Sequence, residues 1–254
     1  TLEKLVVTMF VTYTAKYVPS ELPKPWKAFS SYKAGNIIAF MDNLMNNILY
    51  RSRYDELSVH VATGLNAQTV FSDYPPEDLV NCDTFAVIDQ ILIKWLVERL
   101  VAEDTGAKLD ELTIPQLCEK RSKMHFGEKA GSRYQMLSSA YQMIQAGNYH
   151  CPDSFKDILR QYQETDSGLD YEYRRFYTAY DQIEDTTAFE PLRDLVENIY
   201  TNEYLEMLLP KWNAAIQEPD AFMALPLQRD FYARNLKNAK ERTVVIISDA
   251  MRYE

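Results

Sequence analysis

TVVIISDAMRYE, residues 243–254, is the stretch of sequence that decides the fold. Val244–Ile247 are four consecutive β-branched residues, the pattern of a strand that is buried on both faces of a parallel sheet. Ser248 and Asp249 follow at the carboxyl end of that strand, where open α/β sheets bind their ligands. Such a strand needs neighbouring strands, and no other segment of the sequence has a comparable pattern. We therefore expect residues 241–254 to be the first strand and turn of a truncated α/β domain, and the chain to be a piece of a longer protein.

The remainder of the sequence has the periodicity of helices. Apolar residues recur every three or four positions over Leu2–Tyr13, over Asn36–Tyr50 and over Asp83–Glu103. Further helices are predicted after Tyr54 with Asp55 as the N-cap, after the capping box of Thr113 and Gln116, and over 128–146, 169–183, 188–200, 204–216 and 227–236. The predicted fold class is all-α, a multi-helix body with a single terminal β-strand that belongs to the truncated domain.

Residues 1–240 form the predicted helical region. Two segments have the composition of a loop and are candidate boundaries between helical subdomains. One lies at 148–153, within the sequence Gly-Asn-Tyr-His-Cys-Pro-Asp, and the other is the polar stretch 165–168. The sequence does not choose between them, so one or two subdomains remain open.

Composition excludes several classes of protein. The formal net charge of −10 argues against non-specific attraction to DNA phosphates. The three cysteines, Cys82, Cys118 and Cys151, are odd in number and widely spaced, which is typical of reduced thiols in a cytoplasmic protein. Apolar segments such as Leu5–Val11 are too short to span a bilayer, so no membrane partner is expected.

The terminal Ile-Ile-Ser-Asp-Ala-Met-Arg-Tyr-Glu resembles the opening strand of the catalytic domain of the PglZ family, part of bacterial BREX phage-defence systems and of the alkaline-phosphatase superfamily. The resemblance is strongest to the type A form. Three earlier stretches are similar to the region before that domain, more loosely: Asp83-Thr84-Phe85 with Asp89, Lys120-Arg121-Ser122-Lys123-Met124-His125, and Tyr173-Arg174-Arg175-Phe176-Tyr177.

The resemblance implies that the full-length protein is a metal-dependent phosphatase or phosphodiesterase. It makes Asp249 the first ligand of a two-metal site, with divalent zinc as the expected ion, and Arg252 a candidate phosphate contact. The other ligands and the nucleophile would follow Glu254, so the chain itself is expected to lack catalysis and a bound metal. Without the resemblance, Asp249 is a helix N-cap and Arg252 a solvated charge.

Partners are also implied by the resemblance. They are the methyltransferase and the small accessory proteins of the same defence system. DNA or another phosphoester substrate would be reached only through the missing catalytic domain. The localisation that follows is the bacterial cytoplasm.

Two alternatives arise from residues in the body. A hydrolase site could be assembled from His125, Cys118 and nearby carboxylates. Stacking of bases on the helix that carries Tyr171, Arg174 and Arg175 would make the chain a nucleic-acid-binding module. Against this second alternative, Tyr173, Phe176, Tyr177 and Tyr180 have the spacing of a helix face turned into a core. The densest basic run, Lys120, Arg121 and Lys123, is interpreted as a solvated helix face.

Overall fold

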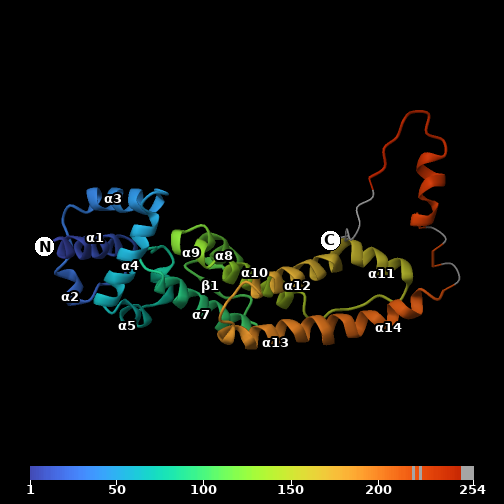
Figure 1. Cartoon of the computed structure of the whole chain (residues 1–254). Coiled ribbons are helices and arrows are strands. Elements are labelled where there is room, and N and C mark those ends of the chain that lie inside the picture. Colours follow the sequence, from blue (N-terminus) through green and yellow to red (C-terminus); the bar gives the residue numbers. More distant parts are fainter. Residues whose placement is uncertain (219–220, 223–224, 247–254) are drawn as a thin grey trace.

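The structure, a computed structural model, describes residues 1–218, 221–222 and 225–246, and shows an elongated helical body. Helices α1 to α5 gather at the N-terminal end, α7 to α10 form the middle, and α13 and α14 extend along the body toward its other end (Figure 1). No helix among the described residues combines the length and the apolar character that crossing a membrane requires.

Helices account for most of the described chain. They are α1 (Leu2–Tyr17), α2 (Lys24–Lys27), α3 (Ala34–Asn46), α4 (Arg51–Gly64), α5 (Ala67–Ser72), α6 (Pro76–Leu79), α7 (Val87–Val101), α8 (Ile114–Ser122), α9 (His125–Lys129), α10 (Gly131–Gln145), α11 (Phe155–Gln161), α12 (Ser167–Tyr180), α13 (Glu190–Asn198) and α14 (Glu206–Ala215). The π-helical turns are η1 (Tyr162–Asp166), η3 (Ile199–Leu205) and η5 (Tyr232–Leu236), and the 3₁₀ turns are η2 (Thr187–Phe189) and η4 (Gln228–Asp230). The mostly helical fold class is confirmed.

A two-residue turn joins the only strands in the described part of the chain. β1 (Lys108–Leu109) pairs antiparallel with β2 (Leu112–Thr113), with Leu109 opposite Leu112. Asp110 and Glu111 have φ of 49° and 61°, the conformation that tight hairpins need at both central positions. This hairpin was not predicted, because its strands are too short to show alternation of apolar and polar residues. It places Thr113 at the start of α8, where the predicted capping box with Gln116 forms.

The N-terminal half is built around aromatic packing. Phe10 of α1, Tyr54 of α4 and Phe85 before α7 are all buried, and the ring of Phe10 lies 5.4 Å from that of Tyr54 and 5.8 Å from that of Phe85. This core continues through α7, α8, α10, α12 and α13. The helices of the first half are therefore held to the middle of the body by shared buried side chains.

Two details of the predicted helices are wrong. Asp55 is no N-cap, because α4 begins at Arg51 and Asp55 lies inside it. The helix predicted over 36–50 ends early, because α3 ends at Asn46. Of its apolar residues, Phe40 and Ile48 are exposed while Met41 is buried. The chain turns at residues 47–50, so the helical periodicity extended past the real end of the helix.

Residues 165–168 are helical, within the continuous run of α11, η1 and α12. The loop at 148–153 lies between α10 and α11, and α12 packs back on α10. A small second hydrophobic cluster is formed by Cys151 of this loop with Phe155, Ile158 and Ala215. The subdomain boundary stays a prediction.

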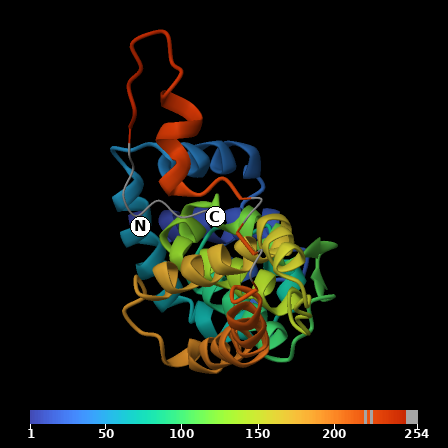
Figure 2. The ribbon, with the colours of Figure 1, turned by 90° about the vertical axis from the view of Figure 1, so that its right-hand side faces the viewer.

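The segment that carries η4 and η5 stands apart from the helical body, as the red part of the ribbon shows (Figure 2). Among its described residues, none is buried. Before it, Ala221, Phe222 and Leu225 still pack against the cluster around Phe155. Residues 243–246, the described part of the predicted strand, have no regular secondary structure, and Val244 and Ile246 are exposed.

Candidate functional site

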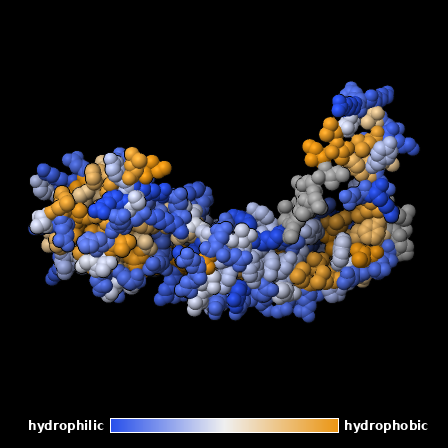
Figure 3. Space-filling view, in the orientation of Figure 1, coloured by the Kyte–Doolittle hydropathy of each residue, from blue (hydrophilic) through white to orange (hydrophobic). Residues whose placement is uncertain are grey.

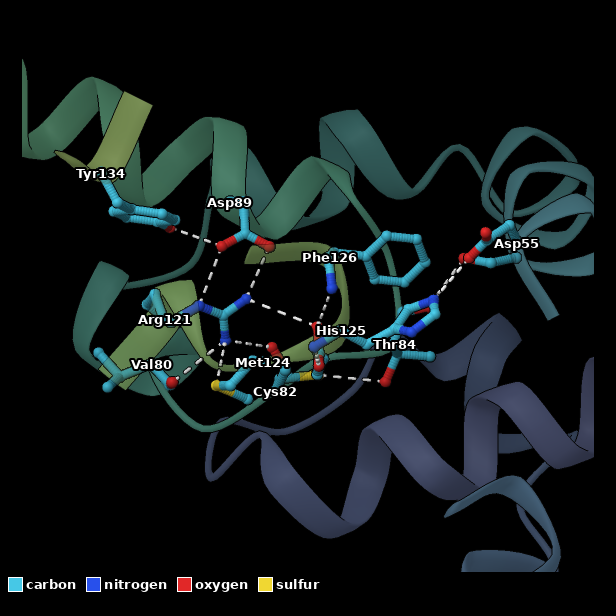
Figure 4. A network of polar contacts seen from close by, with 12 residues as sticks. Asp55, Val80, Cys82, Thr84, Asp89, Arg121, Met124, His125, Phe126 and Tyr134 are labelled. Carbon is cyan, nitrogen blue, oxygen red and sulfur yellow. Dashed lines mark hydrogen bonds and ion pairs between the residues drawn. The ribbon is translucent and has the colours of Figure 1, made fainter. Parts of the chain in front are cut away.

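Arg121 of α8 lies at the centre of a buried polar network (Figure 4). Its side chain is fully buried, and it binds Asp89 of α7 through two parallel hydrogen bonds, Nε to Oδ1 at 3.0 Å and Nη2 to Oδ2 at 2.8 Å. Nη1 donates to the carbonyl oxygens of Val80 at 3.2 Å and Cys82 at 2.8 Å. Tyr134 of α10 donates its hydroxyl hydrogen to Asp89. This side chain therefore connects α7, α8 and the segment between α6 and α7, and through Asp89 it reaches α10.

The interpretation of residues 120–123 as a solvated face is wrong for Arg121. Burial opposes its charge, but the nearby Asp89 carboxylate more than offsets this, so the pKa of Arg121 is raised. Lys123, by contrast, is exposed and pairs with Glu119. One face of α8 is solvated and the other is turned into the body, which a count of consecutive charges cannot show.

Asp83 caps a helix that is distant in the sequence. Its Oδ2 accepts a hydrogen bond from the backbone N–H of His125, and its Oδ1 accepts one from Phe126 at 3.1 Å. These N–H groups belong to the first turn of α9, where no intrahelical acceptor exists. Burial raises the pKa of Asp83, and Arg121, with one nitrogen 3.8 Å away, works in the opposite direction.

His125 connects α9 to α4. Its Nε2 lies 2.6 Å from Oδ1 of Asp55, and Nε of Arg51 donates to its Nδ1 at 3.1 Å. Because Arg51 is always a donor, Nδ1 is the acceptor, and the ring hydrogen is on Nε2, facing Asp55. Arg51 also pairs with Glu128, and Lys129 with Asp55. Four ion-pair or hydrogen-bond contacts therefore fasten α4 to α9.

Gly127 permits the close approach of α9 to the end of α8. A Cβ atom at this position would lie 1.7 Å from the carbonyl oxygen of Arg121 and 2.5 Å from its carbonyl carbon. Only glycine fits such a backbone contact. The polar network and this backbone contact both fix the position of α9 relative to the end of α8.

A groove of about 710 Å³ adjoins the network. α7 forms one wall, the segment from Phe126 to Arg133 in α9 and α10 forms the other, and residues 185–189 contribute to the lining. Its lining residues are Ala86, Asp89, Gln90, Ile93, Lys94, Val97, Glu98, Phe126, Lys129, Ala130, Arg133, Asp185, Ala188 and Phe189. The network thus sets the spacing of the two walls.

The predicted metal ligand Asp249 and the predicted phosphate contact Arg252 lie outside the described residues. Within the described ranges, no three His, Cys, Asp or Glu side chains are grouped so as to hold a metal ion. The described residues therefore do not fit a metal site, and no chemical step through a metal is assigned to them.

The structure gives the Cys118–His125 alternative no support. Cys118 is buried on α8, and burial raises the pKa of its thiol to about 12, far from that of a reactive thiolate. The imidazole of His125 is engaged by Arg51 and Asp55 instead. The three cysteines are free of disulfides.

The aromatic residues of α12 are largely in the core, as their spacing predicts. Phe176 and Tyr180 are buried, and Tyr173 and Tyr177 both donate hydrogen bonds to Glu197, at 2.8 and 2.7 Å. Tyr173 also stacks on Tyr200 with 3.7 Å between ring centroids. The rings of Tyr173 and Tyr177 therefore face α13 and η3 and are not available to stack on bases. Tyr171 differs, because it is 45% exposed and the guanidinium of Arg175 lies over its ring.

The network was not predicted as a unit. Asp83 and Asp89 entered through the family resemblance, and Arg121 through that resemblance and as part of a basic run interpreted as solvated. A signal was present, because Asp89 is an acid inside the apolar segment 85–97, and a buried acid needs a buried cation. Which cation it pairs with, 32 residues away, is not encoded locally.

Comparison with curated proteins finds relatives that match along this chain. The alkaline phosphatase-like protein PglZ of Bacillus cereus (strain H3081.97) is 31% identical over 264 residues, covering 100% of this chain and 30% of that protein. The alkaline phosphatase-like protein BrxZ of Escherichia coli O9:H4 (strain HS) is 27% identical over 237 residues, covering 85% of this chain and 27% of that protein. The chain spans less than a third of the length of either relative. No family model and no solved structure matches.

Proposed function

The chain is of the PglZ type, and from that premise we propose that it forms the helical interaction and positioning module of a BREX phage-defence protein. The observation that carries this is the buried network around Arg121, which cross-links α7, α8 and α10 and lies beside the α4–α9 contacts of His125. A body held by such contacts keeps a fixed shape, which suits a part that orients other parts.

Exposed apolar residues supply a surface for partners. Ile48 and Leu49, in the turn between α3 and α4, are 89% and 77% exposed, and Tyr50 beside them is 52% exposed. An orange patch is visible at this corner of the body in the space-filling view (Figure 3). Apolar side chains that gather on a surface are typical of sites that bind other proteins.

The whole protein acts, in this proposal, as a phosphatase or phosphodiesterase that uses a divalent metal, with zinc the expected ion. Asp249 is the proposed first metal ligand and Arg252 the proposed phosphate contact. The 254-residue chain is proposed to be inactive by itself, since one carboxylate does not make a metal site. The proposed partners are the methyltransferase and the small accessory proteins of the same system.

The catalytic half of the proposal is tested with bis-p-nitrophenyl phosphate and Zn²⁺, Mg²⁺ or Mn²⁺. The purified 254-residue chain is expected to give no turnover above the metal alone. Hydrolysis that scales with protein concentration and survives repeated purification would contradict the assigned role.

The interaction half is tested by size-exclusion chromatography of the chain mixed with each purified component of the system. Co-elution with at least one component is expected. The double variant Ile48→Ser/Leu49→Ser should weaken it, whereas Val59→Ser, an equally polar change at a 62% exposed position of α4, should not. Separate elution from every component would refute a docking role.

A further inference from the structure

We propose that the groove between α7 and α10 binds a small organic anion, whose apolar body lies on the groove floor and whose carboxylate, sulfonate or phosphate pairs with Arg133. The volume of about 710 Å³ lies within the range of ligand pockets, roughly 300–1,000 Å³. A site of this kind goes beyond the proposed role in docking proteins.

The floor of the groove is apolar. Ile93, Phe126, Ala130 and Phe189 are buried there, and Val97 is half-buried. On α7 the lining runs from Ala86 to Glu98, so the groove follows that helix for ~18 Å. An apolar floor of this length can cover an aromatic ring system or an alkyl chain.

The rim of the groove is polar, and most of its charges are already matched. Asp89 is fully engaged by Arg121 and Tyr134, and Lys129 pairs with Asp55. Lys94 lies 4.0 Å from Glu98 on the same helix. The groove therefore does not offer a free excess of negative charge to a cation.

Arg133 is the exception. It is half-buried, and among the described residues no protein atom accepts a hydrogen bond from its guanidinium. Hydrogen bonds from Thr187, and to a lesser extent the charge of Arg133, hold the pKa of Asp185 below its ordinary range, but the two side chains form no ion pair. A guanidinium has five N–H donors in a planar fork that matches a carboxylate or phosphate.

The position of Arg133 in its helix also supports a role in binding a ligand. It lies in the first turn of α10, which contains no acidic residue. A cation there faces the positive end of the helix dipole and does not stabilise the helix. Arg133 thus contributes neither a protein hydrogen bond nor helix stability. The N–H donors of its guanidinium remain available to a ligand in the adjoining groove.

The test uses three probes on the 254-residue chain. They are 8-anilinonaphthalene-1-sulfonate (ANS), followed by fluorescence, and AMP and decanoate as competitors that represent nucleotide and alkyl carboxylate sources. Saturable ANS binding is expected. AMP should displace ANS if the groove takes a nucleotide, and decanoate should displace it if the groove takes an alkyl carboxylate. Arg133→Gln should weaken ANS binding about tenfold or more, since it removes a charged hydrogen bond.

Two further variants localise the binding. Ala188→Trp, at an exposed lining residue, should fill the groove and abolish ANS binding. If the Ala188→Trp protein does not fold, Gln90→Trp on the other wall serves the same purpose. Arg53→Gln removes an equivalent charge from the separate groove between α1 and α4 and should change nothing. Binding that is absent, or equal in the wild type and both groove variants, or lost equally in Arg53→Gln, would overturn the assignment.

Discussion

The guanidinium of Arg121 and the carboxylate of Asp89 form a two-point ion pair in the interior of the protein, at 3.0 and 2.8 Å. The Arg121 side chain is 0% exposed and that of Asp89 4%. The pair joins α8 to α7, and Nη1 of Arg121 donates to two backbone carbonyls. A buried pair of this kind is tolerated because its charges are paired and further hydrogen bonds offset the loss of water.

Arg121→Met should destabilise the fold strongly. It leaves Asp89 as an unpaired buried charge, which costs about 3–5 kcal/mol in the free energy of unfolding. Arg121→Lys should cost less but still measurably, because an ammonium cannot make the two-point contact. Urea unfolding followed by circular dichroism measures both.

The matched control is Lys123→Met, at the residue that follows the last residue of α8. The Lys123 side chain is 70% exposed, and its pair with Glu119 is exposed as well. Its free energy of unfolding should stay within about 0.5 kcal/mol of the wild type. Equal losses of unfolding free energy in the two methionine variants would show that the buried Arg121–Asp89 pair stabilises the fold no more than the exposed pair does.

Gly127→Ala should also be severe. The added methyl group would meet the carbonyl of Arg121 at 1.7 Å, so α9 must move away from α8. A loss of about 3 kcal/mol in the free energy of unfolding is expected, the upper end of the usual range for overpacked sites. Gly131→Ala is the control, because a Cβ there has no atom within 4 Å, and it should be neutral or slightly stabilising. Thermal unfolding compares the two variants. A small change in stability for Gly127→Ala would show that α9 can move away from the Arg121 carbonyl at little cost.

Asp83→Ala removes the cap of α9 and should speed exchange of two backbone amides. These are His125 and Phe126, whose N–H groups both bind the Asp83 carboxylate. A lost cap costs about 0.5–2 kcal/mol, so their hydrogen-exchange protection should fall by about tenfold. Asp110→Ala, at an exposed acceptor for Asn81, should leave both amides unchanged. Unaltered exchange in Asp83→Ala would rule out the capping role.

Asp55 should make stability depend on pH in the acid range. Partial burial raises its pKa, but hydrogen bonds from Lys129 and His125 outweigh this, and the pKa lies below its ordinary value of 3.8. A lowered folded-state pKa means that the carboxylate stabilises the fold above about pH 4, and that this contribution disappears as the pH falls through the folded pKa.

Asp55→Asn tests this dependence. Near pH 7 the variant should be less stable than the wild type by about 1 kcal/mol, a value limited by the partial exposure of the pair. The difference should shrink between about pH 4 and pH 2, because the wild-type carboxyl becomes neutral there. Chemical unfolding at a series of pH values measures it, and a difference that is independent of pH would contradict the assignment.

Cys82 and Cys118 should resist thiol reagents in the folded protein. Burial is the main cause that raises their pKa values, to about 11 for Cys82 and to about 12 for Cys118. Labelling with iodoacetamide at pH 8, followed by mass spectrometry, should modify neither until denaturant is added. Rapid native labelling of Cys118 would revive the hydrolase alternative.

The sequence predicted features whose physical causes lie close together in the chain. The helical class follows from apolar periodicity, and the start of α8 follows from the capping box of Thr113 and Gln116, three residues apart. The orientation of α12 was also predictable, because i, i+3, i+4 spacing places Phe176 and Tyr180 on one face. Each of these depends on neighbours within one or two turns of helix.

Only the tertiary structure decided which polar residues are buried. Arg121 pairs with a residue 32 positions away, and Asp83 caps a helix that begins 42 positions later. Charges in a sequence look alike whether they face water or an opposite charge in the interior. The difference is set by which helices meet. Here α7, α8 and α10 meet around the Arg121–Asp89 pair, and Gly127 lets α9 approach the end of α8.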